Sequence, residues 1–454
     1  MTARQVWRLL LVGLGTSIVP LDTAVNIAFP DINRSFDLPL QMIQWVVICY
    51  VLTYASLVLA FGRVGDIFGH ARVFRIGLLW SSVAYLLCAA APSYGWLLFC
   101  RFLQGVGASL IVSCAPALVI GLFPDDKRSR AVSVFTVIYA IGSAAGPFLG
   151  GAFIQVWGWP SVFWFRAPLA LMALLFLEGV PAVSRPGLRE PLDIVGAVML
   201  TIGISTLLLT LNLLQSLDQN ALLAIGLPAI SAVSLFCFAR WERRVAQPIV
   251  NFDFFRMRGF ATVNFASFLI YLTSFSVLLF GPYYLVRFAN LSVLAAGAIL
   301  AASFAGSIIA SPLAGSLISR VAATRLASLG ALLDAAGLVL IGSWTPGATV
   351  QAVALIGALL LQGFGVGLFQ VAYMDIVMRT LPRQHRGVAG SITMLSRSLG
   401  VVTGATVLTL IFHAIEGFAS GDGFLSAFRA TFWLAGVASA LAAVLVQPAT
   451  KIER

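Results

Sequence analysis

Three of the charged residues that stand inside long apolar runs of this chain could take part in proton chemistry. They are Asp22, Arg101 and Asp334. Burial among apolar residues penalises the charged form of a carboxylate, so a buried aspartate can take up and release a proton. A nearby arginine would stabilise the charged form and so tune that exchange. We therefore expect Asp22 and Arg101 to act in proton coupling, with Asp334 as a second proton site.

Each of these residues also has a structural interpretation. Asp22 could lock the turn formed by Thr23–Asn26 through hydrogen bonds, and Arg101 could join two helices through backbone carbonyls. Asp334 could face a polar seam inside a helix bundle, or it could contact a cationic substrate. The residues alone leave these alternatives open.

The composition is that of a membrane protein. Of 454 residues, 60% are hydrophobic and 10% are charged, against about 45–50% and 25% in soluble proteins. The net charge of +11 therefore does not indicate a nucleic-acid partner. The only lysines are Lys127 and Lys451, so no phosphate-binding GK[ST] loop is present. The histidines are isolated, and the five cysteines lie in or beside apolar runs, so we expect no metal and no cofactor.

Fourteen apolar runs are long enough, or nearly so, to span a bilayer. They cover residues 7–29, 43–62, 73–92, 95–119, 131–154, 162–182, 194–214, 221–239, 259–281, 292–317, 324–344, 349–377, 388–413 and 426–447. With the N-terminus in the cytoplasm, 22 of the 28 basic residues fall in cytoplasmic segments and three fall outside. This bias predicts fourteen helices in the inner membrane, with both termini cytoplasmic.

The chain also repeats itself. Gln104-Gly105 recurs as Gln362-Gly363, 258 residues later, and several other pairs share this spacing. We expect an all-helical membrane fold with a six-helix half at 1–183, inserted helices 7 and 8 with their loops at 184–258, and a second six-helix half at 259–454. Two related halves around a central cavity are typical of alternating-access transporters.

Five motifs then occur in the expected helices. They are Pro20–Pro30, Gly62–Arg72, Arg101–Ala108, Gly142 with Gly146–Gly151, and Asp193–Gly196. In these the chain resembles the major facilitator superfamily, and specifically its fourteen-helix drug:proton antiporter branch. The resemblance implies export driven by proton entry, with Asp22 loaded from outside and Arg101 tuning its release. Arg166 departs from the branch, which usually has asparagine there, and the thirteenth helix lacks the acid that some exporters of dications carry.

The stretch Gly62–Arg72 predicts a short, charged turn at the cytoplasmic end of the second helix. We expect it to act as a cytoplasmic gate, in which Asp66 meets the start of helix 13 just after Arg386. The predicted gate residues are Gly62, Gly65, Asp66, Gly69, Arg72 and Arg386.

The fifth helix carries a proline among small residues. Proline bends a helix and glycine allows close packing, so this helix could seal one end of the cavity, although ordinary packing gives the same pattern. The residues concerned are Gly142, Gly146, Pro147, Gly150 and Gly151. Separately, Tyr50 and Tyr54 share a helix face. With Gln104 and Gln362 they are our candidates for the substrate cavity.

The favoured function is a proton-coupled exporter of amphiphilic, drug-like molecules, acting as a monomer. The alternatives are an exporter dedicated to one metabolite, lipid or antibiotic, and a nutrient importer, against which the fifth-helix motif speaks. A membrane enzyme is disfavoured because no catalytic constellation is present. The sequence alone assigns no role to Arg166 or Arg397.

Overall fold

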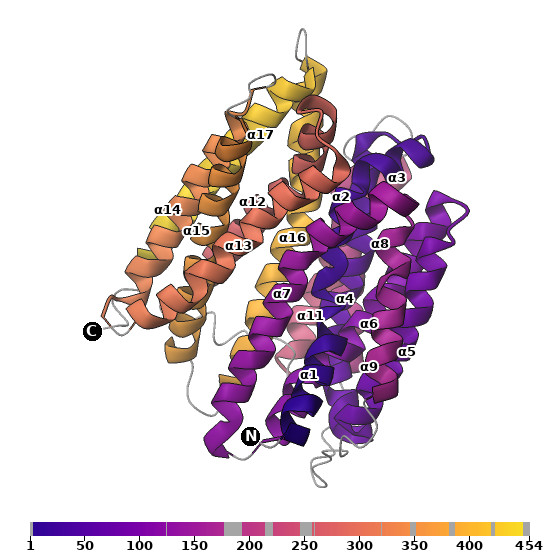
Figure 1. Cartoon of the computed structure of the whole chain (residues 1–454), viewed down its shortest axis with the longest axis vertical. Helices are drawn as coiled ribbons and strands as arrows, with labels where there is room; N and C mark the ends of the chain where they lie inside the picture. Colours follow the sequence, from indigo (N-terminus) through magenta and orange to yellow (C-terminus); the bar gives the residue numbers. More distant parts are fainter. Residues whose placement is uncertain are drawn as a thin grey trace. The chain divides into compact units, whose positions relative to one another are not determined.

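The structure is a computed structural model in which residues 3–123, 125–176, 193–213, 221–245, 257, 259–318, 320–345, 351–380, 386–418 and 423–447 are described. All regular structure within these ranges is helical (Figure 1). The chain divides into two compact units, residues 1–201 and 202–454. In Figure 1 the first unit runs from indigo to magenta, and the second ends in orange and yellow.

Eleven helices of the described part are long and apolar enough to cross a bilayer, which requires about 20 residues. Three shorter apolar helices accompany them, at Gln44–Tyr54, Ser161–Phe176 and Val198–Leu207. Lipid offers no hydrogen bonds to the backbone, so an apolar chain that enters it must pair its own amides and carbonyls, as helices do. The protein is therefore an integral, multi-pass membrane protein.

The first apolar run is interrupted by a tight turn, although its composition predicts one continuous helix. Its segments are α1 (Ala3–Ser17), the 3-10 turn η1 (Pro20–Thr23), α2 (Ala24–Ile27) and α3 (Phe29–Ser35). Pro20 has no amide hydrogen and cannot continue the bonding of α1. The amide of Asp22 instead donates to the Val19 carbonyl at 3.1 Å, across three residues. Asp22 thus lies in a turn between two helical pieces.

The rest of the first unit packs around this broken span. Its elements are η2 (Leu40–Ile43), α4 (Gln44–Phe68), α5 (His70–Ala89), α6 (Tyr94–Gly121), α7 (Asp125–Trp157), α8 (Ser161–Trp164) and α9 (Arg166–Phe176). Helix α6 packs against both α4 and α5, and α7 packs along α1, η1 and α2. This arrangement brings side chains of α6 and α9 to the turn that carries Asp22.

The predicted turn at Gly62–Arg72 is much shorter than its glycines suggest. Only Gly69 separates α4 from α5, with φ 91° and ψ 122°, a conformation that favours glycine. A Cβ atom on Gly65 would lie 2.5 Å from His70 Nδ1, whereas one on Gly62 would meet nothing closer than 3.9 Å. A glycine inside a helix costs only about 1 kcal/mol of stability relative to alanine. A cluster of glycines therefore need not end a helix, and α4 continues through Gly62 and Gly65 to Phe68.

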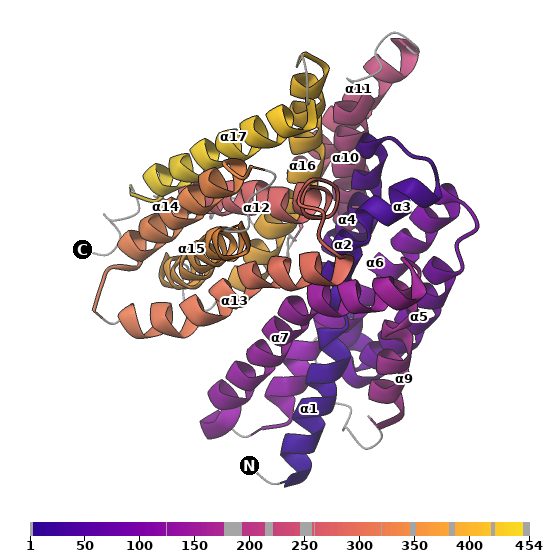
Figure 2. The same ribbon diagram turned by 45° about the horizontal axis from the view of Figure 1, so that its top comes forward.

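The second unit contains the remaining helices. They are α10 (Ile194–Leu213), which crosses the unit boundary, α11 (Ala221–Glu242), α12 (Phe260–Tyr283), α13 (Val293–Leu317), α14 (Ala323–Gly342), α15 (Gln351–Thr380), α16 (Arg386–Phe418) and α17 (Gly423–Val446). Helix α14 packs between α15 and α17 (Figure 2), α13 packs on α15, and α12 packs on α16 and α17. The Ser231 hydroxyl of α11 donates to the Gly203 carbonyl of α10 at 2.8 Å.

Close contact between α14 and α15 positions the second carboxylate. A Cβ atom on Gly365 would overlap the backbone nitrogen of Asp334, so the two helices can approach this closely only because residue 365 has no side chain. One turn earlier on α15, Gln362 is brought against Asp334.

Candidate functional site

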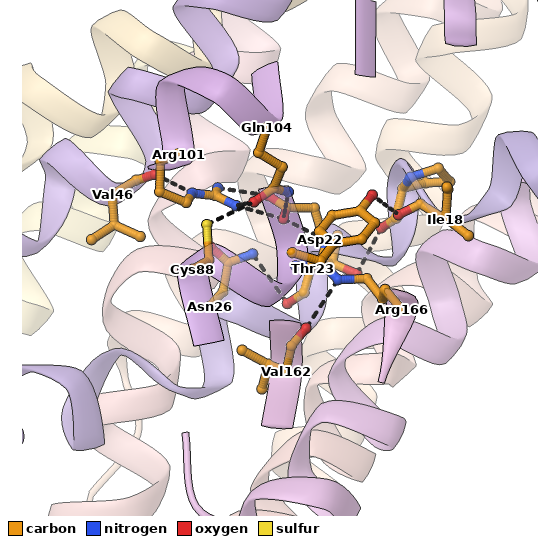
Figure 3. Close-up of polar contacts among 12 residues, drawn as sticks. Ile18, Asp22, Thr23, Asn26, Val46, Cys88, Arg101, Gln104, Val162 and Arg166 are labelled. Carbon is orange, nitrogen blue, oxygen red and sulfur yellow. Dashed lines mark hydrogen bonds and ion pairs between the residues drawn. The ribbon is translucent and has the colours of Figure 1, made fainter. Parts of the chain in front are cut away.

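Asp22 is the centre of a buried ionic cluster in the first unit. Arg101 of α6 binds both of its carboxylate oxygens, with Nη1–Oδ1 and Nη2–Oδ2 distances of 2.7 Å each. Arg166 of α9 binds Oδ1 at 2.7 Å through Nη1, and Gln104 Nε2 binds the same oxygen at 2.8 Å. Figure 3 shows Asp22 between the two arginines. The cluster thus joins the first-span turn to two other helices.

A second layer of contacts fixes both guanidinium groups. Arg101 Nε donates to the Val46 carbonyl of α4 at 2.8 Å, and Arg166 Nε donates to the Val162 carbonyl of α8 at 2.9 Å. The Tyr50 ring lies 4.4 Å from the Arg101 guanidinium carbon, and the Tyr85 ring lies 4.5 Å from that of Arg166. The contacts of Arg101 with the carboxylate and with a backbone carbonyl, which were alternatives at the sequence level, are therefore both present.

The charges of this cluster do not cancel. Two guanidinium groups face one carboxylate, and the Arg101 and Arg166 side chains are 1% and 0% exposed. Charge-assisted, partly bidentate bonds of this kind favour an ionised carboxylate. Asp22 is therefore held as an anion in this conformation.

Arg166 is the residue of this cluster to which the sequence alone assigns no role. The sequence does indicate that Arg166 has a polar partner, because an arginine among apolar residues must bind a carboxylate or carbonyl groups. Spacing along the chain gave no indication of the partner, since Asp22 is 144 residues away.

The predicted fifth-helix residues pack directly on the turn that carries Asp22. A Cβ atom on Gly142 would lie 2.8 Å from the Ser17 carbonyl oxygen, and one on Gly146 would overlap Thr23 Oγ1. Gly150 is equally close to α2, and Gly151 and Pro147 are buried. The residues therefore form a helix contact, while their predicted role in sealing a cavity stays a prediction.

Pro147 explains one polar contact across this interface. In a regular helix the amide of residue 147 would donate to the Ser143 carbonyl, and proline has no such hydrogen. The Thr23 hydroxyl lies 3.0 Å from that carbonyl oxygen and 3.1 Å from the Pro20 carbonyl oxygen, so it can donate to the position that the proline leaves open. The residue next to Asp22 is thereby tied to α7.

Asp334 is the centre of a second cluster, whose described partners are all neutral. Its Oδ1 accepts from Gln362 Nε2 at 2.7 Å and from the Ser274 hydroxyl at 3.2 Å. The Ser439 hydroxyl of α17 lies 2.6 Å from Oδ2. Asp334 is completely buried. A fully buried carboxylate whose described partners are all neutral is costly to keep ionised.

Ser439 can satisfy this carboxyl group in either protonation state. Its oxygen lies 2.6 Å from Asp334 Oδ2 and 3.0 Å from the Ala331 carbonyl oxygen, but a hydroxyl has only one proton to donate. If Asp334 is ionised, the serine donates to the carboxylate. If Asp334 is protonated, the acid donates to the serine, which then donates to Ala331. Neither heavy atom has to move between the two states.

The repeated glutamines have matching but not equivalent partners. Gln104 binds Asp22 of the first span, and Gln362 binds Asp334 of α14. Each amide is oriented by a donor to its oxygen, Arg101 Nη1 at 2.7 Å for Gln104 and the Ser303 hydroxyl at 2.6 Å for Gln362. The sequence repeat thus preserves an amide that binds a carboxylate, while the carboxylates come from different helices.

The remaining predicted residues are those of the substrate cavity and of the cytoplasmic gate, and the structure describes only some of their side chains. Tyr50 and Tyr54 stack at 6.2 Å and are largely buried, and Gln362 lines a cavity of the second unit. Gly62, Gly65, Gly69 and the exposed Arg72 lie at the α4–α5 junction. The side chains of Asp66 and Arg386 lie outside the described part of the structure, so the predicted gate contact stays a prediction.

Comparison with known proteins identifies the family of this chain. The model of the Major Facilitator Superfamily matches residues 10–252 and 263–454. The riboflavin transporter RibZ of Clostridioides difficile is 26% identical over 414 residues, which cover 90% of this chain and 89% of that protein. Multidrug resistance protein 3 of Bacillus subtilis is 28% identical over 364 residues, covering 80% and 71%. Other relatives are also named as multidrug or antibiotic resistance proteins.

Solved structures share the fold at low sequence identity. A bacterial homologue of the human lysosomal transporter Spinster superposes with a TM-score of 0.67 at 16% identity, covering 100% of this chain and 96% of that one. Because the family model covers nearly the whole chain, the protein belongs to the Major Facilitator Superfamily and is a transporter of small molecules rather than an enzyme.

Proposed function

We propose that this protein is a proton-coupled exporter of amphiphilic small molecules, of the fourteen-helix drug:proton antiporter branch. The observation that carries the proposal is the Asp334 site. A fully buried carboxyl with neutral described partners, beside a hydroxyl that serves both protonation states, is suited to exchange a proton. An ionisable residue buried within a membrane-spanning helix is a functional candidate by default.

Asp22 has a different part in the proposed cycle. Two guanidinium groups hold it ionised, so a proton can bind only if at least one of these contacts breaks. Protonation of Asp22 would therefore favour a conformation in which α6 or α9 has moved away from the first-span turn. A ligand shifts an equilibrium only through its different affinities for two states. In this scheme Arg101 and Arg166 give Asp22 a lower affinity for a proton in this conformation than in one where a guanidinium contact is broken.

The proposed topology is supported by the positions of the apolar helices. The eleven candidate spans and the three shorter helices fall on the fourteen predicted runs. We retain the proposed halves at 1–183 and 259–454 with helices inserted between them, cytoplasmic termini, a location in the inner membrane and a monomeric state. The contact of Asp66 with the start of α16 is retained as the proposed cytoplasmic gate.

Export of drug-like compounds is supported by the relatives named as multidrug or antibiotic resistance proteins, which match most of the chain. A second candidate, a transporter dedicated to one metabolite, is favoured by the similar riboflavin transporter. Both would use the same coupling residues, so only the substrate range separates them.

Accumulation of three compounds in cells tests the proposal. The panel is ethidium, puromycin and riboflavin, compared in cells with and without the protein. We expect lower accumulation of at least one compound and loss of that difference with a protonophore. Reduction of a single compound would support the dedicated exporter. Unchanged accumulation of all three would contradict amphiphile export, and raised accumulation would indicate import.

A further inference from the structure

A cavity of about 120 Å³ lies within the second unit, between α12, α13, α15 and α16. A water molecule takes up about 30 Å³ in the liquid, so the cavity has room for about four. Its wall includes four polar side chains among apolar ones, namely Ser274, Ser303, Ser307 and Gln362. Buried water requires such partners. The cavity is therefore roomy and polar enough to hold a short chain of water molecules.

Two serines of α13 give the cavity hydrogen-bond acceptors. The Ser303 hydroxyl donates to Gln362 Oε1 and the Ser307 hydroxyl donates to the Gly363 carbonyl, both at 2.6 Å. Each hydroxyl proton is already used, so the lone pairs of these two oxygens remain to accept from water. The α13 side of the wall can thus orient water inside the cavity.

Asp334 lies directly behind another part of this wall. It is completely buried and does not line the cavity, but two wall residues bind it. Gln362 Nε2 donates to its Oδ1 at 2.7 Å, and the Ser274 hydroxyl donates to the same oxygen at 3.2 Å. Its third described partner, Ser439, is itself completely buried and is not a wall residue. Ser274 and Gln362 therefore separate the carboxyl group from the cavity.

Of these two wall residues, only Ser274 can pass a proton. The amide nitrogen of Gln362 donates and accepts nothing, so it can hold the carboxylate but cannot deliver an added proton. A hydroxyl group has a proton and lone pairs, and can accept on one side while it donates on the other. The 3.2 Å between Ser274 Oγ and Asp334 Oδ1 is within the reach of about 2.6–3.2 Å for proton transfer. Ser274 is also partly exposed, whereas Gln362 is buried.

We propose that Ser274 is the residue through which Asp334 exchanges its proton with water in this cavity. For uptake, a hydrated proton forms a bond to Ser274 Oγ, while the O–H bond already directed at Asp334 breaks and its proton joins Oδ1. The carboxylate becomes a neutral acid, the serine again has one proton, and neutral water remains. Release reverses these steps. The inference names a residue that serves the Asp334 site, and so rests on the proposed function for its biological role.

The ionisable groups around this path do not replace Ser274. Tyr271 of α12 and Arg397 of α16 line the cavity, with 5.3 Å between the guanidinium carbon and the ring centre, and neither is a described partner of Asp334. A guanidinium group stays protonated in proteins and has no acceptor for an incoming proton. On the helices packed against α14, Asp375 and Arg379 pair with each other at 2.7 Å near the end of α15, and Arg429 lies in the exposed first turns of α17.

Infrared difference spectroscopy tests the proposal, because a protonated carboxyl group has a carbonyl band that a carboxylate lacks. The sample is the full chain in lipid nanodiscs, and the band that is lost in Asp334→Asn is assigned to Asp334. The measured quantity is the rate at which this band grows after a rapid drop in pH. The measurement needs neither a substrate nor transport.

Two variants of similar shape separate the hydroxyl group from packing. Ser274→Thr and Ser274→Val both enlarge the side chain, but only threonine keeps a hydroxyl group, and valine leaves no space for water in its place. We expect Ser274→Val to slow growth of the band at least tenfold and Ser274→Thr to stay within about threefold of the wild type. Equal rates for these two folded variants would overturn the proposal and show that water reaches the carboxyl group directly.

Two further variants complete the test. Ser307→Val removes a wall hydroxyl that binds a backbone carbonyl rather than Asp334, and should stay within about threefold of the wild type. Ser274→Ala removes the relay without added volume and should slow the band at least threefold. A wild-type rate in Ser274→Ala, or equal slowing by Ser307→Val and Ser274→Val, would contradict the role of Ser274.

The two proposals fail separately. A rate that depends on the Ser274 hydroxyl, in a protein without proton-driven transport, would contradict the proposed function alone. Proton-driven transport with equal rates for Ser274→Val and Ser274→Thr would contradict the role of Ser274 alone. Absence of the Asp334 band at every pH at which the protein is folded would contradict both, because Asp334 would then take up no proton.

Discussion

The Thr23 hydroxyl lies 3.0 Å from the Ser143 carbonyl oxygen, the acceptor that Pro147 leaves without its helical donor. Thr23 directly follows Asp22, so the turn that carries a candidate proton site is joined to α7 through one hydroxyl group. The motif of the fifth helix and the motif of the first span therefore act as one structural unit.

Replacement of Thr23 tests this connection. Thr23→Val keeps the shape of the side chain but leaves a carbonyl without a donor, which costs about 1–3 kcal/mol for a buried group. We expect Thr23→Val to lower the free energy of unfolding by that order and Thr23→Ser to restore most of it. Denaturant titration of the purified protein measures both. Equal stability of the valine and serine variants would show that the hydroxyl contributes nothing.

Gly146 should tolerate no side chain. A Cβ atom there would overlap Thr23 Oγ1, whereas one on Gly62 would meet nothing closer than 3.9 Å. We expect Gly146→Ala to lower both stability and transport, because α7 must move away from the turn that holds Asp22. Gly62→Ala is the matched control for stability alone and should unfold at a temperature close to that of the wild type. Similar behaviour of the two alanine variants in thermal unfolding would argue against the close contact.

The ionic cluster should be more sensitive to loss of its anion than to loss of one cation. Asp22→Asn leaves two buried guanidinium groups, and an uncompensated buried charge costs about 3–5 kcal/mol. Arg166→Met leaves Asp22 paired with Arg101 and should cost less. In the double variant the loss should be clearly smaller than the sum of the two single losses. Strict additivity in the unfolding free energies would mean that Arg166 does not share the charge of Asp22.

Ser439 should matter for coupling rather than for packing. Ser439→Ala removes the hydroxyl that lies 2.6 Å from Asp334 Oδ2. A hydrogen bond to a charged group contributes about 1.5–3 kcal/mol, so we expect proton-driven transport to fall about tenfold or more. Ser328→Ala is the control, because Ser328 joins the same two helices through the Ala443 carbonyl at 2.9 Å and does not bind the carboxylate. Equal rates for the two variants in proteoliposomes would remove Ser439 from the mechanism.

The sequence could identify the carboxylates because charges are rare in apolar runs. Asp22, Arg101 and Asp334 stand out on that basis, and the structure shows that the first two are in contact. Ser439 could not be found, since a serine in a membrane helix carries no signal of its own and only tertiary packing brings it to Asp334. The partner of Arg166 was hidden for the same reason.

Local geometry was predicted less well than residue type. The interruption at Pro20 is not predicted by hydrophobicity, because the apolar run on both sides of it is long enough for one continuous helix. The glycines of the second-helix motif predicted a turn over Gly62–Arg72, yet α4 continues to Phe68, and within the motif only Gly69 adopts a positive φ. Hydrophobicity therefore predicts where the apolar helices lie. The points where a helix ends or is interrupted depend instead on single residues, such as Pro20 and Gly69, and on their neighbours.

The central claim is that the carboxyl group of Asp334 carries a proton during transport. The most direct measurement is uptake driven by an imposed pH gradient in proteoliposomes that contain Asp334→Asn, which keeps the shape of the side chain and cannot ionise. The transported probe is whichever of ethidium, puromycin or riboflavin the wild-type protein exports. We predict that Asp334→Asn loses pH-driven uptake at least tenfold but keeps probe exchange in the absence of a gradient. Wild-type rates of pH-driven uptake in Asp334→Asn would contradict the account.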